Sequence, residues 1–226
     1  MITEVGVMAV KPNLNIMEDA TPEGQILSRL YQTVTTASGG PYRVYWGLEI
    51  EDPLRLWAFF DFDSVEQHEE FAKNVGEEAV KDLPKILSIG YFTKHVAVTP
   101  SPPLVLLSPV TEIMLAYFPS NISTGAKEAA STRFKQFKEK GLDKCDDVKG
   151  VSYGWGIEND FPVLGGEEGQ KGSLLTAFIG WPSVDAHMRF RETEAFKKNV
   201  DLLTGMEGLT HLGMVHISCR SLERKT

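Results

Sequence analysis

The sequence contains an internal repeat, and this repeat constrains the fold more than any other feature. Residues 58–71 read AFFDFDSVEQHEEF, and residues 177–190 read AFIGWPSVDAHMRF. Six of these fourteen positions are identical, whereas unrelated segments of average composition would share about one. A match of this quality between distant parts of one chain indicates two copies of a single folding unit.

Weaker matches flank this segment in the same order in both copies. The matched pairs are 7–10 with 113–116, 46–49 with 155–158, and 89–91 with 212–214. In chain order, the offsets between the copies are 106, 109, 119 and 123 residues. Loop insertions in the second copy would produce such an increase, so the chain is interpreted as a tandem duplication.

Each copy predicts a strand, a helix, two strands, a second helix and a last strand. Proline at the start of a helix, serine caps and the spacing of apolar residues support this order. The first copy has strand 5–10, a helix from Thr21-Pro22 with buried Ile26, Leu27, Leu30 and Val34, strands 43–51 and 56–62, a helix capped by Ser64, and strand 86–98. The second has strand 111–118, helix 126–137 ending at Gly141, strands 151–158 and 173–179, a helix capped by Ser183, and strand 209–218. This α+β pattern is two ferredoxin-like β-α-β-β-α-β repeats.

A proline-rich segment separates the two copies. We expect an N-terminal half at 1–99, a stiff extended linker at 100–109 and a C-terminal half at 110–226. The four aliphatic residues 104–107 within the linker are expected to pack against another part of the chain. Each sheet would have one face covered by its helices and one apolar face. The two apolar faces are expected to close into an intramolecular pseudo-dimeric barrel, which also protects the sheet edges.

The junction between the third strand and the second helix carries a family resemblance. An aromatic residue, Ser-Val-(Glu/Asp)-x-His and a following Phe resemble the dimeric α+β barrel superfamily, which includes antibiotic biosynthesis monooxygenase-like domains, stress-responsive barrels and olivetolic acid cyclase-type proteins. The chain resembles a fused version of fungal type. The resemblance implies an apolar pocket between each sheet and its helices, used in that superfamily for cofactor-independent oxygenation, polyketide-type cyclisation, isomerisation or haem breakdown. One fold serves unrelated reactions there, so the resemblance fixes no reaction.

Charge and cysteine content limit the partners and the compartment. The formal net charge is −8, from 31 acidic and 23 basic residues, and an acidic surface repels nucleic acid. The two cysteines cannot form a disulfide framework or a closed zinc site on their own. We find no signal-peptide pattern at the start and no apolar run of about 20 residues. A cytoplasmic protein without membrane or nucleic-acid partners is expected, as a pseudo-dimeric monomer or a weak homodimer.

His68 and His187 occupy matching positions, four residues after their capping serines. His68 lies on the same helix stripe as Val65 and Ala72, so it is expected to face the protein interior. Two interpretations remain open. Each histidine is either an acid–base group at a pocket or a structural residue that bonds a backbone carbonyl and fixes the strand–helix corner.

The last strand of each copy also carries a histidine. In the first copy, Tyr91 and His95 share one strand face and are expected to lie about 13 Å apart, far enough to hold opposite ends of a small aromatic substrate. His216 is on the corresponding face in the second copy. The resemblance to olivetolic acid cyclase-like proteins implies a general base on this strand. The alternative for His95 is a solvent-exposed position beside Lys94.

Aromatic residues on the middle strands are candidates for binding a flat substrate. Trp46, Tyr153 and Trp155 would stack on its rings, although core packing explains large aromatics equally well. Glu49 and Glu158 match between the copies, and the alternation of the strand favours the solvent side for both.

Motifs for other chemistry were not found. The sequence has no Gly-x-Gly-x-x-Gly or Gly-Lys-Ser/Thr phosphate loop, no CxxC pair and no metal-binding histidine spacing. We therefore expect no metal and no nucleotide cofactor.

Three hypotheses follow. The first is a small-molecule enzyme that uses His68, His95, His187 or His216 for acid–base chemistry on a phenolic or polyketide-like substrate, as a cyclase, isomerase or monooxygenase. The second is a non-catalytic small-molecule-binding or stress-related barrel protein. The third is that one half is only a scaffold. Because the loop 161–172 occurs in one copy, the two pockets are expected to differ, with at most one active.

Overall fold

The computed structural model describes residues 1–224, and the chain forms two compact units. Unit 1 contains Met1–His95 together with the segment from Ile217 onward, and unit 2 contains Val96–His216. The sequence-based boundaries at 99 and 110 therefore differ from the observed division. The reason lies in two strands that connect the units. Residues 96–99, at the end of one long strand, pair within unit 2, whereas the segment after residue 216 belongs to unit 1.

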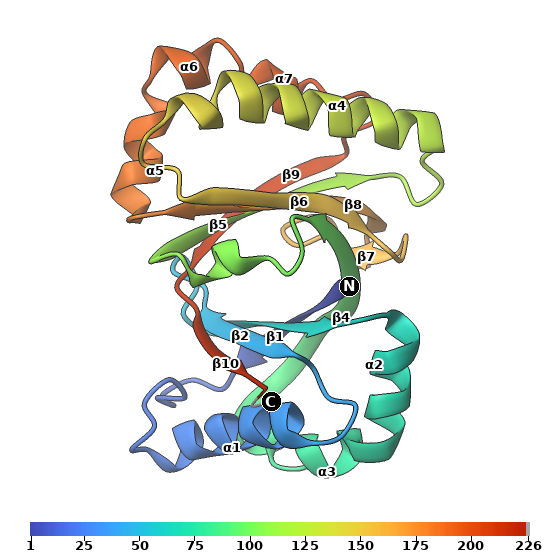
Figure 1. Ribbon diagram of the computed structural model, residues 1–226, viewed down its shortest axis with the longest axis vertical. Helices are drawn as coiled ribbons and strands as arrows, with labels where there is room; N and C mark the ends of the chain where they lie inside the picture. The colour runs from blue at the N-terminus through green and yellow to red at the C-terminus, as the bar shows by residue number, and fades with distance from the viewer. Residues whose placement is uncertain (225–226) are drawn as a thin grey trace. The chain divides into compact units, whose positions relative to one another are not determined.

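Unit 1 is built on a sheet with the strand order β10-β2-β3-β1-β4. Its elements are β1 (Ile2–Val10), α1 (Pro22–Thr36), β2 (Arg43–Leu48), β3 (Arg55–Phe62), α2 (Val65–Phe71), α3 (Glu77–Val80), the first part of β4 (Leu87–Thr99) and β10 (Arg220–Glu223). A π-helical turn, Ala72–Gly76, joins α2 to α3. The helices cover one face of this sheet (Figure 1).

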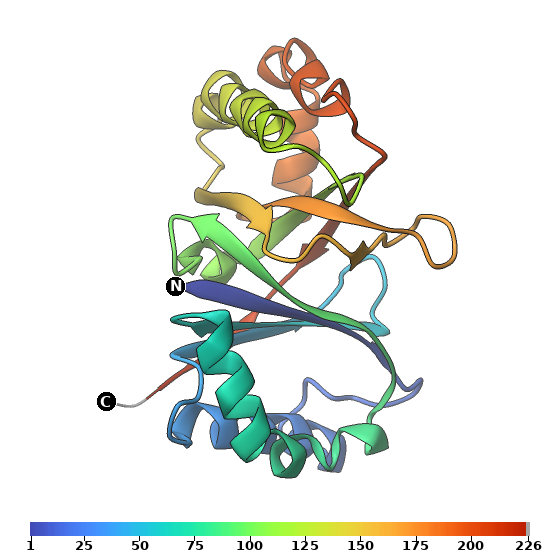
Figure 2. The same cartoon turned by 90° about the vertical axis from the view of Figure 1, so that its right-hand side faces the viewer.

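Unit 2 repeats this arrangement, with the end of β4 followed by β6, β8, β5 and β9 across its sheet. Its elements are β5 (Val110–Phe118), α4 (Thr124–Lys140), β6 (Gly150–Gly156), β7 (Phe161–Pro162), β8 (Lys171–Trp181), α5 (Val184–Arg191), α6 (Glu194–Lys197), α7 (Asp201–Thr204) and β9 (His211–Ile217). Its helices again cover one face of the sheet (Figure 2). The predicted α+β class and the two ferredoxin-like repeats are confirmed.

Three helices begin where the sequence predicts, whereas α4 begins at Thr124, two residues before the predicted start. The Thr21 hydroxyl accepts a hydrogen bond from the amide of Gly24 at the start of α1. Ser64 and Ser183 do the same for α2 and α5, at 3.3 and 3.1 Å. An N-cap of this type contributes about 1 kcal/mol. It also fixes the rotation of each helix, which determines where the histidine four residues later points.

The insertion 161–172 forms a hairpin, in which the short strand β7 pairs with β8. The linker also differs from the extended connector that was predicted, because Leu104–Leu107 forms a 3₁₀ turn. Within this turn Leu106 is fully buried, whereas Leu104 and Leu107 are about half exposed. Between residues 1 and 224, no helix combines the length and hydropathy needed to cross a membrane.

Strand pairing corrects two offsets in the repeat. Gly6 faces Ala58 and Met114 faces Ala177. Since Ala58 and Ala177 are equivalent, β1 and β5 align at an offset of 108, whereas the sequence match gave 106. By the same reasoning, Trp46 faces Ala58 and Tyr153 faces Ala177, so Trp46 corresponds to Tyr153 and not to Trp155.

The strand β10 is fastened to unit 1 by Arg220. Its guanidinium donates to the carboxylate of Asp19 at 3.0 Å and to the carbonyl of Met17 at 2.9 Å. It also lies 5.6 Å from the ring centroid of Trp46. These contacts hold the last strand on the edge of β2, whose residues 43–46 it pairs with.

Replacing Arg220 by Ala is therefore expected to speed amide hydrogen exchange in β10 and β2. Arg220→Lys should have an intermediate effect, because lysine retains the charge but not the two-pronged pairing with Asp19. Hydrogen exchange followed by mass spectrometry measures this directly. Unchanged exchange in β10 of the alanine variant would show that backbone pairing alone holds the strand.

Candidate functional site

Unit 1 joins an acidic residue and two histidines through their side chains. Nδ1 of His68 on α2 lies 2.8 Å from Nε2 of His95 on β4. Nε2 of His68 lies 3.1 Å from Oε2 of Glu4 on β1. The three side chains thus form one continuous series of contacts, Glu4 to His68 to His95, and we call such a series of side chains a Glu–His–His chain.

Local structure places each member of this chain. The Ser64 cap sets His68 one turn into α2, with its ring 5.0 Å from the ring of Phe62. Strands β1 and β4 are neighbours in the sheet, so Glu4 and His95 can both reach the helix above them. The alternative of a solvent-exposed His95 is wrong, since this residue is only 6% exposed.

Unit 2 contains the same chain. Nδ1 of His187 on α5 lies 2.7 Å from Nε2 of His216 on β9, and Nε2 of His187 lies 3.4 Å from Oε2 of Glu112 on β5. These contacts make His95 equivalent to His216, an offset of 121 where the sequence match gave 123. The four histidines singled out from the sequence thus form two pairs, one in each unit.

The two glutamates were missed in the sequence. Glu4 and Glu112 are equivalent at the corrected offset of 108, but at 106 Glu4 falls opposite Val110. Aligning the first strand two residues differently would have shown one acidic residue in each copy, at matching positions on the face that the helices cover. That is the signal that could have revealed them.

The chain in unit 1 borders a cavity. Glu4 and His68 line a space of about 200 Å³ between the sheet and the helices. The rest of the lining is largely apolar and includes Leu27, Tyr31 and Phe60. Burial raises the pKa of the Tyr31 hydroxyl. The cavity therefore offers one acid–base end and an apolar, aromatic body, as small-molecule sites commonly do.

In unit 2 the corresponding chain is more tightly enclosed. The side chains of His187 and Glu112 are 4% and 5% exposed, against 17% and 11% for His68 and Glu4. Trp181, at the position of Phe62, stacks on His187 with ring centroids 5.0 Å apart and donates from Nε1 to Glu112 at 3.0 Å. Unit 2 therefore has the same acid–base groups in a packed core.

The chain can store and move a proton. A carboxylate has two oxygens and several lone pairs, so Glu4 can accept from His68 and from a second donor in the cavity. Either tautomer of His68 fits these contacts: Nε2–H donates to Glu4 while Nδ1 accepts from His95, or Nδ1–H donates to His95 while Nε2 accepts. In the second tautomer, a proton that reaches Glu4 can pass to Nε2 of His68, and His95 accepts a hydrogen bond from the resulting imidazolium.

The chain is arranged differently from a metal site. The two ring nitrogens of His68 are directed at two different neighbours, so the donor atoms do not converge on one point. Within residues 1–224, no group of three or more His, Cys, Asp or Glu side chains is positioned to hold a metal ion.

The aromatic candidates lie apart from the Glu–His–His chains. Tyr91 is 39% exposed, with the guanidinium of Arg55 5.3 Å from its ring centroid. Trp46 packs against Tyr31 with ring centroids 4.5 Å apart. Tyr153 packs against Phe134, and Trp155 donates to the Ser131 hydroxyl and lies 5.3 Å from the Phe118 ring. Trp46 thus contacts a residue that lines the Glu4 cavity, and the role of these four residues in substrate binding stays a prediction.

The expectation that Glu49 faces solvent is wrong. Glu49 is 3% exposed, accepts hydrogen bonds from Arg55 at 3.1 Å and from Nε1 of Trp57 at 3.0 Å, and corresponds to Gly156 rather than to Glu158. Trp57 and Arg55 alternate with the β3 residues that face the helices, so this ion pair belongs to the other face of the sheet.

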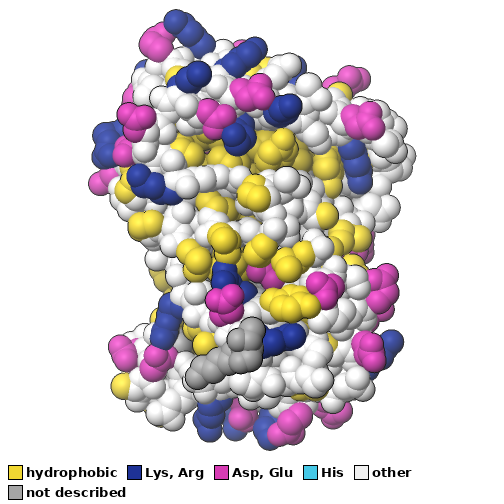
Figure 3. All heavy atoms as spheres, in the orientation of Figure 1, with side chains coloured by type: hydrophobic (Ala, Val, Ile, Leu, Met, Phe, Trp, Pro, Cys, Tyr) yellow, Lys and Arg dark blue, Asp and Glu magenta, His cyan; other side chains and the backbone are white. Residues whose placement is uncertain are grey.

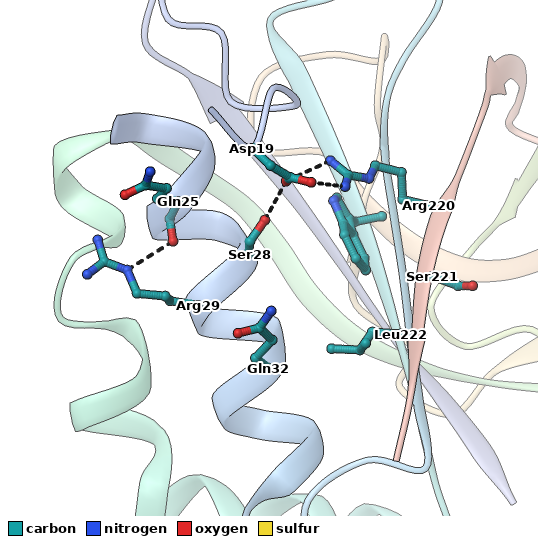
Figure 4. Close-up of a pocket in the computed structure, with 9 residues that line it drawn as sticks. Asp19, Gln25, Ser28, Arg29, Gln32, Arg220, Ser221 and Leu222 are labelled. Carbon is teal, nitrogen blue, oxygen red and sulfur yellow. Dashed lines mark hydrogen bonds and ion pairs between the residues drawn. The ribbon is translucent and has the colours of Figure 1, made fainter. Parts of the chain in front are cut away.

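A second concavity lies between α1 and β10 (Figure 4). It is an open groove of about 490 Å³ whose lining carboxylate, Asp19, is already paired with Arg220 and accepts a hydrogen bond from the Ser28 hydroxyl. The Arg220 and Ser28 hydrogen bonds lower the pKa of Asp19 to about 2. This leaves the Glu4 cavity as the better candidate for acid–base chemistry.

On the face drawn in Figure 3, acidic and basic side chains are interspersed, and no large group of lysine and arginine side chains gathers among the described residues there. Several acidic and basic side chains of the described surface form ion pairs with near neighbours, such as Lys198 with Glu194 at 3.1 Å. Surface pairs of this kind contribute little to stability.

Fold and site together define an α+β protein of two ferredoxin-like units, each with its own Glu–His–His chain. No protein-family model matches the sequence, and no curated protein matches it. Solved structures match over nearly the whole length. An anthrone oxidase-like protein aligns with a TM-score of 0.66 at 12% identity, covering 100% of this chain and 94% of that one.

Two bacterial proteins are similar to a comparable degree. A candidate monooxygenase from Fusobacterium nucleatum aligns with a TM-score of 0.63 at 9% identity, covering 99% of this chain and 94% of its own. A candidate monooxygenase from Lactobacillus acidophilus aligns with a TM-score of 0.60 at 10% identity, covering 99% and 96%. At these identities the similarity shows a shared fold, with two ferredoxin-like α+β units in one chain.

Proposed function

We propose that unit 1 is the catalytic unit of a small-molecule enzyme that removes a proton from a phenolic or polyketide-like substrate. The observation that carries this proposal is the Glu4–His68–His95 chain, whose first two members line an apolar cavity. General acid–base catalysis requires such a group within hydrogen-bond reach of the substrate, in a site that excludes water.

The proposed first step is a proton transfer to Glu4. A hydroxyl, or a carbon next to a carbonyl, loses its proton to the Glu4 carboxylate and becomes a phenolate or an enolate. His68 stabilises the new proton position through its hydrogen bond to Glu4, and His95 keeps the His68 ring in place. The proton returns to the substrate or to water at the end of the cycle, so the enzyme is regenerated without a metal or a nucleotide.

The anion can then react in three ways. Protonation at another carbon gives an isomerase, and attack on a carbonyl of the same molecule gives a cyclase. Monooxygenation needs O₂ as the oxidant: one oxygen atom enters the product as a carbonyl, and the other leaves as water with the two hydrogens of a methylene group. The shared fold of the candidate monooxygenases and the anthrone oxidase-like protein supports testing this third course first.

Cavity size limits the substrate. An apolar cavity of about 150 Å³ accommodates benzene, and the space beside Glu4 is about 200 Å³. We therefore expect compounds of one or two fused rings to fit without rearrangement of the helices. A three-ring anthrone would require α2 or α3 to move.

A panel of one-, two- and three-ring phenols, methylene ketones and 1,3-diketones tests the proposal. The protein is incubated with each compound with and without O₂, and products are identified by mass spectrometry. Wild-type protein should convert one- or two-ring members of the panel. Gly6→Met, which places a side chain in the cavity, should lower the rate at least tenfold.

Gly6→Ala is the matched control for that variant. A Cβ at position 6 would lie 3.5 Å from the end of the Met8 side chain, an ordinary contact, so the cavity remains open. Binding of panel compounds without conversion of any would favour the binding-protein alternative. Conversion that Gly6→Met leaves unchanged would place the chemistry elsewhere.

A further inference from the structure

Unit 2 differs from unit 1 most clearly at one position beside the glutamate. Gly6 lines the cavity of unit 1, two residues after Glu4. The equivalent residue in unit 2 is Met114, two residues after Glu112, because each faces the matching alanine of the neighbouring strand. Met114 is 1% exposed and belongs to the core cluster of unit 2. The methionine side chain therefore projects on the face where unit 1 has open space.

At the next position on the same strand face the difference is reversed, and unit 1 has the larger side chain. Met8 in unit 1 corresponds to Ala116 in unit 2. Each unit therefore has one methionine on this strand face, four residues after the glutamate in unit 1 and two residues after it in unit 2. In unit 1 this leaves the region in front of Glu4 and His68 open.

The polar groups needed for binding are still assembled in unit 2. Glu112, His187 and His216 are linked as in unit 1, and Trp181 adds an N–H donor to Glu112. A ligand in front of Glu112 would meet a carboxylate that can accept a hydrogen bond. The surrounding side chains, such as Phe190, are apolar.

We propose that unit 2 contains a second binding site for a small phenol and that the side chain of Met114 closes it. The ring of the phenol would take the place of the methionine side chain, and its hydroxyl would donate to Glu112. Methionine is flexible and fills irregular gaps, so it suits this position. Removing it should leave an apolar cavity that a ligand of matching size can occupy, as engineered cavities do.

Calorimetric titration with phenol tests the proposal through the number of sites per chain. Wild-type protein should bind one phenol, in unit 1. Met114→Gly should bind two, and Gly6→Met should bind none. The double variant Gly6→Met/Met114→Gly should again bind one, with the phenol next to His187 in a crystal structure.

Two further variants serve as controls in case Met114→Gly does not fold. Met114→Ala removes most of the same side chain without a strand glycine and should also gain a site. Leu115→Ala removes a buried side chain from the opposite face of β5 and should bind as wild type does.

The proposal does not depend on catalysis in unit 1. If wild-type protein binds no phenol but Met114→Gly binds one beside His187, the unit 2 site stands and the proposed function is weakened. If both folded Met114 variants bind no more phenol than wild type, or if wild type already binds phenol beside His187, the role of Met114 is wrong.

Discussion

Replacing Glu4 by Gln should lower the turnover of the best panel substrate by about 10²- to 10⁴-fold, the usual contribution of a positioned acid–base group. The amide keeps the size of the side chain and can still accept a hydrogen bond from His68, but it is too weak a base to take the substrate proton. Steady-state kinetics should show the loss mainly in kcat, since the cavity shape is unchanged.

Glu112→Gln is the matched control, because it makes the same change in the equivalent residue of unit 2. It should leave turnover near that of the wild type. Both variants should lose roughly 1–3 kcal/mol of unfolding free energy, the range for a disturbed buried polar pair. Equal losses of turnover in the two variants would show that the Glu–His–His chains act only through stability.

The second large effect is expected for Asp61, a buried carboxyl in β3. Asp61 is 0% exposed, and burial raises its pKa from 3.8 to about 6, although the Thr3 hydroxyl donates to it at 2.8 Å and Tyr45 and Arg43 lower the value. Its second oxygen, Oδ2, has no hydrogen-bond partner among the described residues. Keeping this carboxylate charged in the folded protein therefore costs free energy.

The sign of the pH effect follows from the two pKa values. As pH rises from about 3.8 to about 6, the unfolded chain loses this proton first, so folding stability falls across that window by about 3 kcal/mol and stays lower above it. Asp61→Asn has no proton to lose. It should match wild type near pH 4 and be up to about 3 kcal/mol more stable near pH 7.5.

Urea unfolding at both pH values measures the difference. Asp63→Asn is the control, since Asp63 is a nearby carboxyl on the surface that accepts a hydrogen bond from Tyr42. The same stabilisation at pH 4 and pH 7.5 in Asp61→Asn would rule out the titration of Asp61 as its cause.

The repeat and the element order could be read from the sequence because they depend on local patterns. The equivalence of individual residues could not. Three of the four offsets taken from the sequence differ from the structure by two residues, 106 for 108, 109 for 107 and 123 for 121. A shift of two leaves every side chain on the same face of its strand, so alternation cannot detect it. Only pairing with neighbouring strands fixes the register.

For the same reason, the site could be predicted only in part. His68 was expected to face inward, His187 was matched to it, and His95 and His216 were placed on corresponding strand faces, so the four were recognised as candidates. Their pairing with each other, and with Glu4 and Glu112, depends on contacts across 27 to 75 residues of sequence. The cavity depends on Gly6, whose importance lies in the absence of a side chain.

The return of the last strand to unit 1 has a consequence for biosynthesis. The edge strand β2 cannot receive β10 until all 121 residues of unit 2 have been made. At typical rates of 5–20 residues per second, this takes roughly 6 to 24 s. During that time the nascent first unit presents an unpaired edge, which can accept the last strand of a neighbouring chain. Crowded polysomes would thus favour exchanged dimers, and fast folding of unit 2 would favour monomers.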